Sequence, residues 1–190
     1  MSDTQAVWER IEAWYAAHGA SHLLHPGASE EAMAEAEQQL AMTFPRELRE
    51  SLRRHDGSTA GGWRGGDLLS LEGIQSERQI WMDLLQGGDF DDNQDHNEHS
   101  GQVQPGWWNA GWIPLHADGG GNGYVIDTTP GQAGQVGQVL FMDHEVGPSE
   151  VMFSSLGSYL EDVLGELSSG EWVYSGEYDS LISRDELEEA

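Results

Sequence analysis

Apolar residues recur with the period of an α-helix in five stretches of this 190-residue chain. The spacing predicts helices over residues 4–18, 30–41, 45–55, 77–86 and about 155–167. We expect the first helix to bury one face, which consists of Val7, Trp8, Ile11 and Tyr15.

The fourth of these helices is expected to begin with a capping box. Ser76 and Gln79 have the spacing of that motif, and Ile80 and Leu84 are then expected to point inward. The preceding residues 63–74 are predicted to form short strands or extended segments.

Further along the chain the apolar period changes to two. This pattern predicts strands over residues 111–117, 123–128 and 138–144, with residues 150–153 as a fourth candidate. Short glycine-rich turns between them imply antiparallel pairing. We therefore predict an α+β fold with a mainly antiparallel sheet of about five or six strands covered by helices. Residues 1–175 are expected to form this single domain and residues 176–190 an acidic C-terminal tail.

The charge balance limits the classes of partner. Thirty-four acidic residues face eight basic residues, all of them arginine, for a formal net charge of −26. Such a chain repels nucleic acid and anionic membranes and attracts a protein with a basic surface. Because it has no lysine and no cysteine, chemistry based on a P-loop lysine, a Schiff base or a thiolate is excluded. A cysteine-free chain without a signal-peptide pattern or a long apolar run leads us to expect a cytoplasmic protein.

A glycine-rich run at residues 119–123 is flanked by Asp118 and Asp127. A dinucleotide-binding loop needs a helix directly after its glycines, because the helix N-terminus holds the pyrophosphate. Here predicted strands lie on both sides, and the spacing is not G-x-G-x-x-G. The run is therefore predicted to be a tight turn, and no cofactor is predicted.

Residues 89–106 form an acidic, polar segment. The first oxygen ligands of a calcium loop alternate in the same way as Asp89, Asp91, Asn93 and Asp95. Gln94 stands where such a loop needs glycine and Ser100 where it needs a bidentate glutamate, so no metal site is predicted. A solvated loop that contacts a partner is the preferred interpretation, with a bound cation left open as the alternative.

No arrangement typical of a catalytic site fits its sequence context. His144 and Glu145 follow Asp143, but Pro148 occupies the position of the second histidine of an H-E-x-x-H zinc motif. The chain also has no G-x-S-x-G nucleophile elbow. We therefore predict that the protein is not an enzyme.

The segment LAMTFPRELRESLRRHDGS, residues 40–58, resembles the opening signature of the SUKH superfamily. The residues that match this signature are Phe44, Pro45, Leu48, Leu52, Asp56 and Gly57. A second matching set comes from the strand region and consists of Trp112, Ile113, Pro114, Asp118, Gly119, Gly120, Gly121, Asn122, Asp127, Gly137, Gln138, Val139 and His144. The resemblance covers about Trp8 to Leu167. It implies a SUKH-like α+β fold in which these motif residues are structural and the glycine run is a turn.

The SUKH superfamily includes the yeast Smi/Knr cell-wall assembly regulators and bacterial immunity proteins of polymorphic toxin systems. We predict a bacterial immunity protein that neutralises a cognate toxin with a basic surface, such as a nuclease, by stoichiometric binding. The alternative is a regulatory or scaffold protein of the Smi/Knr type that acts through protein–protein interactions. The candidate toxin-binding residues are the acids of the polar loop and two adjacent tryptophans: Asp89, Asp91, Asp92, Asp95, Glu98, Trp107 and Trp108.

Overall fold

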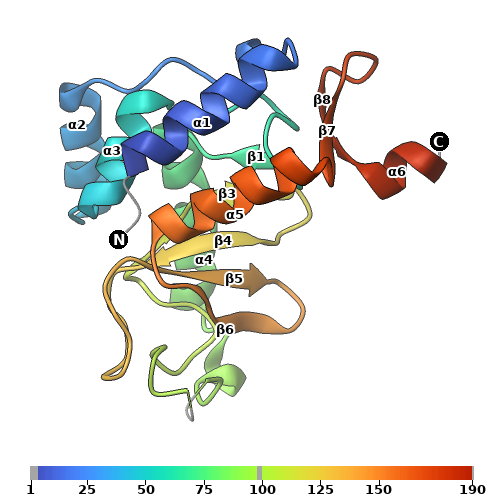
Figure 1. Ribbon diagram of the computed structural model, residues 1–190. Helices are drawn as coiled ribbons and strands as arrows, with labels where there is room; N and C mark the ends of the chain where they lie inside the picture. The colour runs from blue at the N-terminus through green and yellow to red at the C-terminus, as the bar shows by residue number, and fades with distance from the viewer. Residues whose placement is uncertain (1–3, 98–99, 190) are drawn as a thin grey trace.

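A four-stranded antiparallel sheet forms the centre of the molecule (Figure 1). Its strands are, in order, β2 (Trp112–Pro114), β4 (Gly123–Asp127), β5 (Gln138–Asp143) and β6 (Gly147–Phe153). The computed structural model describes residues 4–97 and 100–189. The predicted α+β fold with an antiparallel sheet is confirmed.

The remaining strands form two separate ladders and do not join this sheet. In one ladder β1 (Asp67–Leu68) pairs with β3 (His116–Ala117), and in the other β7 (Trp172–Ser175) pairs with β8 (Ser180–Ser183). The main sheet therefore has four strands, fewer than the five or six expected. These ladders are short, with two residues per strand in the first and four in the second.

The helices of the described chain lie mostly before the sheet and directly after it. They are α1 (Thr4–Ala17), η1 (Ser21–Leu23), α2 (Glu30–Leu40), α3 (Arg46–Arg54), α4 (Leu71–Gly87), η2 (Asp91–Asn93), α5 (Leu156–Ser169) and α6 (Arg184–Glu189). The expected buried face of α1 is confirmed, since Val7, Trp8, Ile11 and Tyr15 are each at most 2% exposed.

The two faces of the sheet carry different cores because side chains alternate along each strand. Ile126 and Val139 pack into the larger core, to which α5 and the helices that contact it, α1 and α3, also contribute side chains. Val125 and Leu140 pack into a second core, on the side where α4 contacts β2. Figure 1 shows α5 on the near face of the sheet and α4 behind it. We call these the α5 face and the α4 face.

The start of α4 differs from the prediction. The helix begins at Leu71, where the Ser70 hydroxyl accepts a hydrogen bond from the Gly73 N–H at 3.1 Å, so Ser76 lies inside the helix. Ile80 was expected to point inward but is 55% exposed. The buried face follows Ile74 and Trp81 instead, which lie seven residues apart on one side of a helix that begins six residues earlier than predicted.

The C-terminal segment contains regular structure. The expected boundary between residues 175 and 176 falls at the turn of the β7–β8 hairpin. Leu181 of β8 is 5% exposed, and its N–H donates to the Gly61 carbonyl at 2.8 Å. In Figure 1 the tip of the β7–β8 hairpin and α6, the last helix, project away from the body of the molecule. The division of the chain into a domain and an acidic tail stays a prediction.

Candidate functional site

The α4 face is built around a stack of tryptophan rings. Trp81 of α4 lies parallel to Trp108, with 5.0 Å between ring centroids and 11° between planes. Trp108 in turn meets the edge of Trp112 from β2 at 5.4 Å. Trp108 is only 4% exposed and belongs to this core. It therefore holds the loop against the sheet.

Trp107 occupies the outer layer of the same cluster. Its ring lies 6.4 Å from that of Phe90 and 5.3 Å from that of His96. A surface hollow of about 220 Å³ beside it is lined by Leu85, Phe90 and both adjacent tryptophans. The half-buried Trp107 is thus the one of the pair that can contact another molecule.

The acidic loop, residues 89–106, is hydrogen-bonded to β6 through His96 and Asn97. The His96 imidazole and the Asn97 amide both donate to the Pro148 carbonyl, at 3.0 and 3.1 Å. Gly147 lies beneath them, and a Cβ at this position would lie 3.0 Å from the Trp107 ring. Glycine there lets the aromatic layer pack directly on the β6 backbone.

The carboxylates of this loop point into solvent. Asp89, Asp91, Asp92 and Asp95 are exposed, and none of them forms an ion pair within the described residues. Glu98, the fifth predicted acid, lies outside the described residues. In the described part of the chain no three His, Asp or Glu side chains converge to hold a metal ion. The loop therefore presents uncompensated negative charge beside Trp107.

The glycine run forms the turn between β3 and β4. Asp118 Oδ1 accepts from the N–H groups of Gly120 and Asn122 at 2.7 and 2.9 Å, and its Oδ2 accepts from the Asn122 amide at 2.7 Å. Partial burial would raise the pKa of Asp118, but these hydrogen bonds lower it overall. Gly119 and Gly121 adopt φ angles of +76° and +101°. The carboxylate therefore stabilises the turn.

Asp127 is a buried strut between the sheet and the acidic loop. The carboxylate is fully buried and accepts from the Thr129 N–H and the Gln138 amide, both at 2.9 Å. The same amide nitrogen donates to the Gln102 carbonyl at 2.9 Å. Burial raises the pKa of Asp127, since the charged form is desolvated.

The other motif residues lie at the ends of elements. Pro45 caps α3, Trp112 and Pro114 bound β2, and the Gly137 N–H donates to the Asp127 carbonyl at 2.8 Å before β5. Gly57 packs on the backbone of Ser70 where α4 begins. None of these five reaches the hollow beside Trp107.

The model of the SMI1/KNR4 family (SUKH-1) matches residues 27–162. The chain belongs to this family. It is 33% identical to the cell wall biosynthesis/cell cycle regulator smi1 of Schizosaccharomyces pombe over 92% of this chain and 38% of that protein. The glucan synthesis regulatory protein of Neurospora crassa is 27% identical over 94% of the chain and 41% of the relative. The cell wall assembly regulator SMI1 of Saccharomyces cerevisiae is 23% identical over 97% and 44%.

These SMI1/KNR4 relatives correct the functional prediction. They are fungal proteins named as regulators, so the interpretation as a bacterial immunity protein and antitoxin with a cognate toxin partner is wrong. The charge argument failed because a strong negative field attracts any basic protein and does not select a toxin. The chain spans about two-fifths of the length of these curated relatives. Among the helices in the described part of the chain, none has the length and apolar composition that crossing a membrane requires.

A second polar cluster, on the α5 face, was not predicted from the sequence. Arg64 and His116 are 6% and 5% exposed although both are polar. Neither stands in a recognisable motif, and they are 52 positions apart in the sequence. The only local signal is a single arginine enclosed by Trp63 and Gly65, which is too common a pattern to indicate a site.

Proposed function

We propose that this chain is a regulatory or scaffold domain that acts through protein–protein contacts and not by catalysis. The observation that carries the proposal is the similarity over nearly the whole chain to proteins named as regulators of the cell wall. The segment Asp143 to Glu145, which has residue types found in catalytic sites, supports the proposal as well, because the side chains of Asp143 and His144 are engaged in turns. Asp143 Oδ1 accepts from the Glu145 and Val146 N–H groups, and the His144 ring donates to Asn122 Oδ1 at 2.9 Å. These side chains hold turns together.

We infer that the partner-binding surface consists of the acidic loop and Trp107. Exposed carboxylates without bound counter-charges steer a basic protein toward this side of the molecule. The half-buried Trp107, stacked on Phe90, is a rigid apolar anchor of the kind that dominates binding energy at interfaces. The predicted contact residues are Asp89, Asp91, Asp92, Asp95 and Trp107, with Glu98 as a candidate outside the described residues. A cytoplasmic location remains a prediction from composition.

A domain replacement tests the regulatory role. The region of the fission-yeast regulator that this chain matches would be replaced by the chain, and growth in the presence of a wall-digesting glucanase would be scored. We expect the chimaera to restore resistance that a deletion of the region loses. A chimaera that accumulates to normal levels but restores nothing would contradict the proposal.

Charge-matched variants test the surface. In the loop variant, Asp89, Asp91, Asp92 and Asp95 become Asn. In the control variant, four exposed acids without ion pairs among the described residues become Gln: Glu31, Glu72, Glu150 and Glu177. Both lose four negative charges. We expect the loop variant and Trp107→Ala, but not the control, to lose glucanase resistance. Equal losses in the loop and control variants would mean that net charge, and not the loop, matters.

A further inference from the structure

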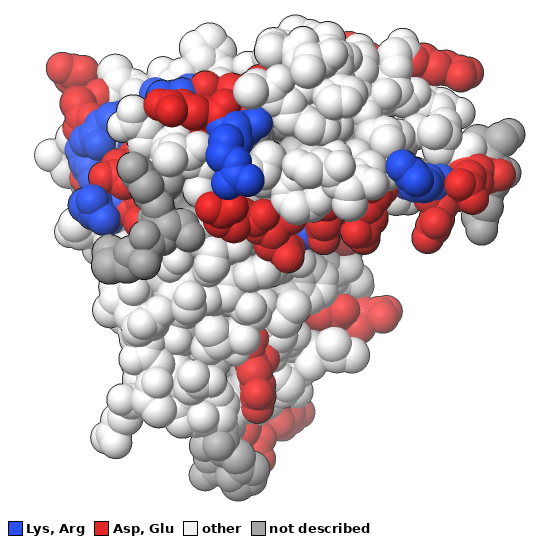
Figure 2. Space-filling model, in the orientation of Figure 1, with Lys and Arg blue, Asp and Glu red and all other residues white. Residues whose placement is uncertain are grey.

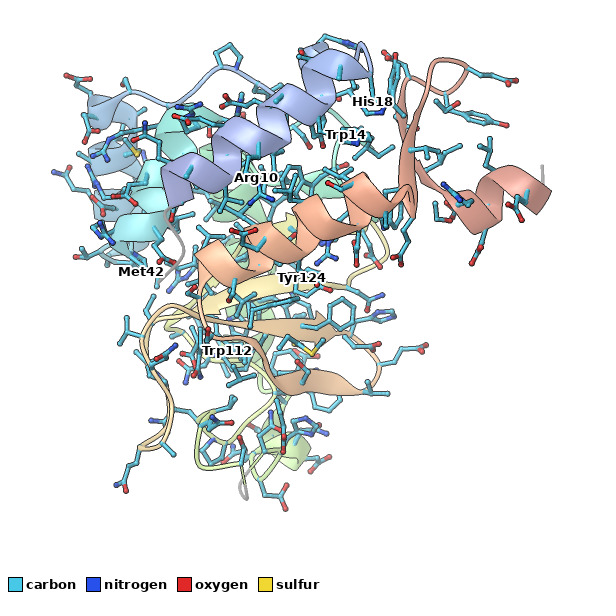
Figure 3. The ribbon with its side chains drawn as sticks, in the orientation of Figure 1. Arg10, Trp14, His18, Met42, Trp112 and Tyr124 are labelled. Atoms are coloured by element: carbon cyan, nitrogen blue, oxygen red, sulfur yellow. The ribbon has the colours of Figure 1, made fainter. Side chains whose placement is uncertain are left out.

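A hollow of about 330 Å³ opens on the α5 face, between the C-terminal end of α5 and the strands below it. We call it the α5 hollow, and its lining includes Arg64, His116, Tyr124, Phe141, Glu166, Glu171 and Trp172. Figure 3 shows Tyr124 on β4 lying between the sheet and α5. The hollow lies on the opposite side of the sheet from Trp107, because Tyr124 packs against the α5 core.

Arg64 shows which chemistry this part of the molecule accommodates. Its guanidinium carbon lies 5.5 Å from the centroid of the Tyr124 ring and 5.1 Å from that of the Tyr159 ring. Its Nη1 pairs with Asp162 at 2.8 Å and also with Glu166. Burial alone would lower the pKa of Arg64, but Tyr159 and Glu166 raise it overall. A guanidinium between aromatic faces and carboxylates is therefore stable here.

The hollow has more negative than positive charge. Three carboxylates line it, those of Asp118, Glu166 and Glu171, and Arg64, the one cation of its lining, is paired with Glu166 and with Asp162. Glu171 is exposed and forms no ion pair within the described residues. Figure 2 shows a row of acidic side chains along the edge of α5 that faces the sheet. A second cation would offset this excess.

His116 lines the hollow and adds no charge to it. Its side chain is buried, and neither ring nitrogen has a hydrogen-bond partner of standard geometry among the described residues. Burial, followed by the charge of Arg64, lowers the pKa of His116 to about 4, so the ring is neutral at pH 7. The neutral imidazole therefore does not offset the excess of carboxylates in the hollow.

The walls of the hollow are aromatic. Phe141 meets the edge of Tyr124 at 5.2 Å, as expected for directly paired residues on β4 and β5. Trp172 of β7 forms the opposite wall and is half-buried. Rings of this kind pack well against a flat, weakly hydrated guanidinium and less well against the compact, strongly hydrated ammonium of lysine.

We propose that the α5 hollow binds an arginine side chain of a partner protein, with its guanidinium against Trp172 and Tyr124 and its charge paired with Glu171 and Glu166. This inference rests on the proposed function only in taking the ligand to be part of a protein. The hollow is then a second recognition surface, separate from the acidic loop and selective for arginine. Asp118 lines the hollow but takes no part, since its carboxylate is engaged in its own turn.

The test is a titration of the full chain with the blocked peptide Gly-Gly-Arg-Gly-Gly at low salt, followed by nuclear magnetic resonance. We expect saturable shifts of the Gly65 amide and the Trp172 indole N–H. The same peptide with citrulline, which is neutral but has nearly the same shape, is expected to leave both signals unchanged, and the lysine peptide to bind more weakly. Equal shifts with citrulline, or no saturation with arginine, would overturn the proposal.

Three variants separate this site from the rest of the acidic surface. Glu171→Gln neutralises one exposed carboxylate and is expected to lower the affinity for the arginine peptide about fivefold. Glu177→Gln, an equally exposed acid six residues away, is expected to leave binding unchanged. The loop variant with four Asn substitutions should also bind normally, so failure of the loop proposal and failure of this one are distinguishable. Equal weakening by Glu171→Gln and Glu177→Gln would contradict a specific hollow.

Discussion

The two faces of the central sheet are covered by cores of different size and composition. On the α5 face a large core is closed by helices, and Trp8, Trp63 and Tyr159 are completely buried. On the α4 face a small aromatic core is covered by one helix and an irregular loop. Buried apolar area provides most of a domain's stability. The α5 face therefore maintains the fold, whereas the α4 face supports a loop whose sequence is freer to serve binding.

The arginines follow the same division. Within the described structure six of the eight arginines form ion pairs. They lie on α1, on α3 and in the turn before β1: Arg10, Arg46, Arg49, Arg53, Arg54 and Arg64. Arg78 of α4 instead donates to the Ala110 carbonyl at 2.7 Å. Local compensation on one side leaves the loop acids on the other side with their full field.

The largest predicted effect is on the α5 face. Trp8 packs 5.5 Å from Trp63 and donates from its indole N–H to Ser51 Oγ at 2.9 Å. Trp8→Ala should lower the free energy of unfolding by about 3–5 kcal/mol, because it leaves a cavity and an unpaired hydroxyl. Urea unfolding measures this. Trp107→Ala, on the half-buried layer, is expected to cost much less, and equal costs would remove the contrast between the faces.

A pH dependence should sharpen the comparison, because His116 lies on the α5 side. Its pKa is about 4 in the folded chain, and an unfolded histidine has a pKa of about 6.5. A depressed pKa means that stability is fully present above pH 6.5 and is lost as the pH falls towards 4. The loss is on the order of 3 kcal/mol. Thermal unfolding from pH 7.5 to 4 would measure it.

His116→Gln is the control for this pH effect, since glutamine does not titrate. We expect this variant to show a much flatter stability profile between pH 6.5 and 4, whereas His18→Gln, at an exposed position, should retain the wild-type slope. A slope unaffected by His116→Gln would mean that other groups cause the pH dependence.

Loss of the buried strut should affect the α4 face selectively. Asp127→Ala removes the acceptor for the Thr129 N–H and the Gln138 amide, at a cost of about 1–3 kcal/mol. Hydrogen exchange should accelerate around Gln102, whose carbonyl is held by the same amide. Asp92→Ala, at an exposed loop position, should change neither quantity. Uniform acceleration over the whole chain would show that the strut supports the entire fold.

The smallest effect is expected from the acidic loop itself. Replacing Asp89, Asp91, Asp92 and Asp95 by Asn should shift the free energy of unfolding by no more than about 0.5 kcal/mol, since these side chains are exposed and unpaired in the described structure. The change should be slightly stabilising at low salt because like charges are removed. A large loss of stability would mean that the loop is structural and not a free binding surface.

Local pattern was sufficient for much of the architecture. The periods of apolar residues determined most of the helices, the antiparallel strands and the buried face of α1, because amphipathic elements must turn their apolar side inward. The glycine run was predicted as a turn because strands flank it. The start of α4 was missed, since Gly73 has a low helix propensity and only the packing of Leu71 and Ile74 compensates for it.

Tertiary structure decided the questions that depend on residues far apart in the sequence. Sequence reasoning made both adjacent tryptophans candidate contact residues, and only the stack with Trp81 decides that Trp108 is the buried one. Likewise, Arg64, His116 and Trp172 come from three separate segments, and their meeting depends on how α5 and β7 fold over the sheet. Periodicity records which side of an element is buried. It carries no information on which distant side chains meet there, because that is set by the packing of whole elements.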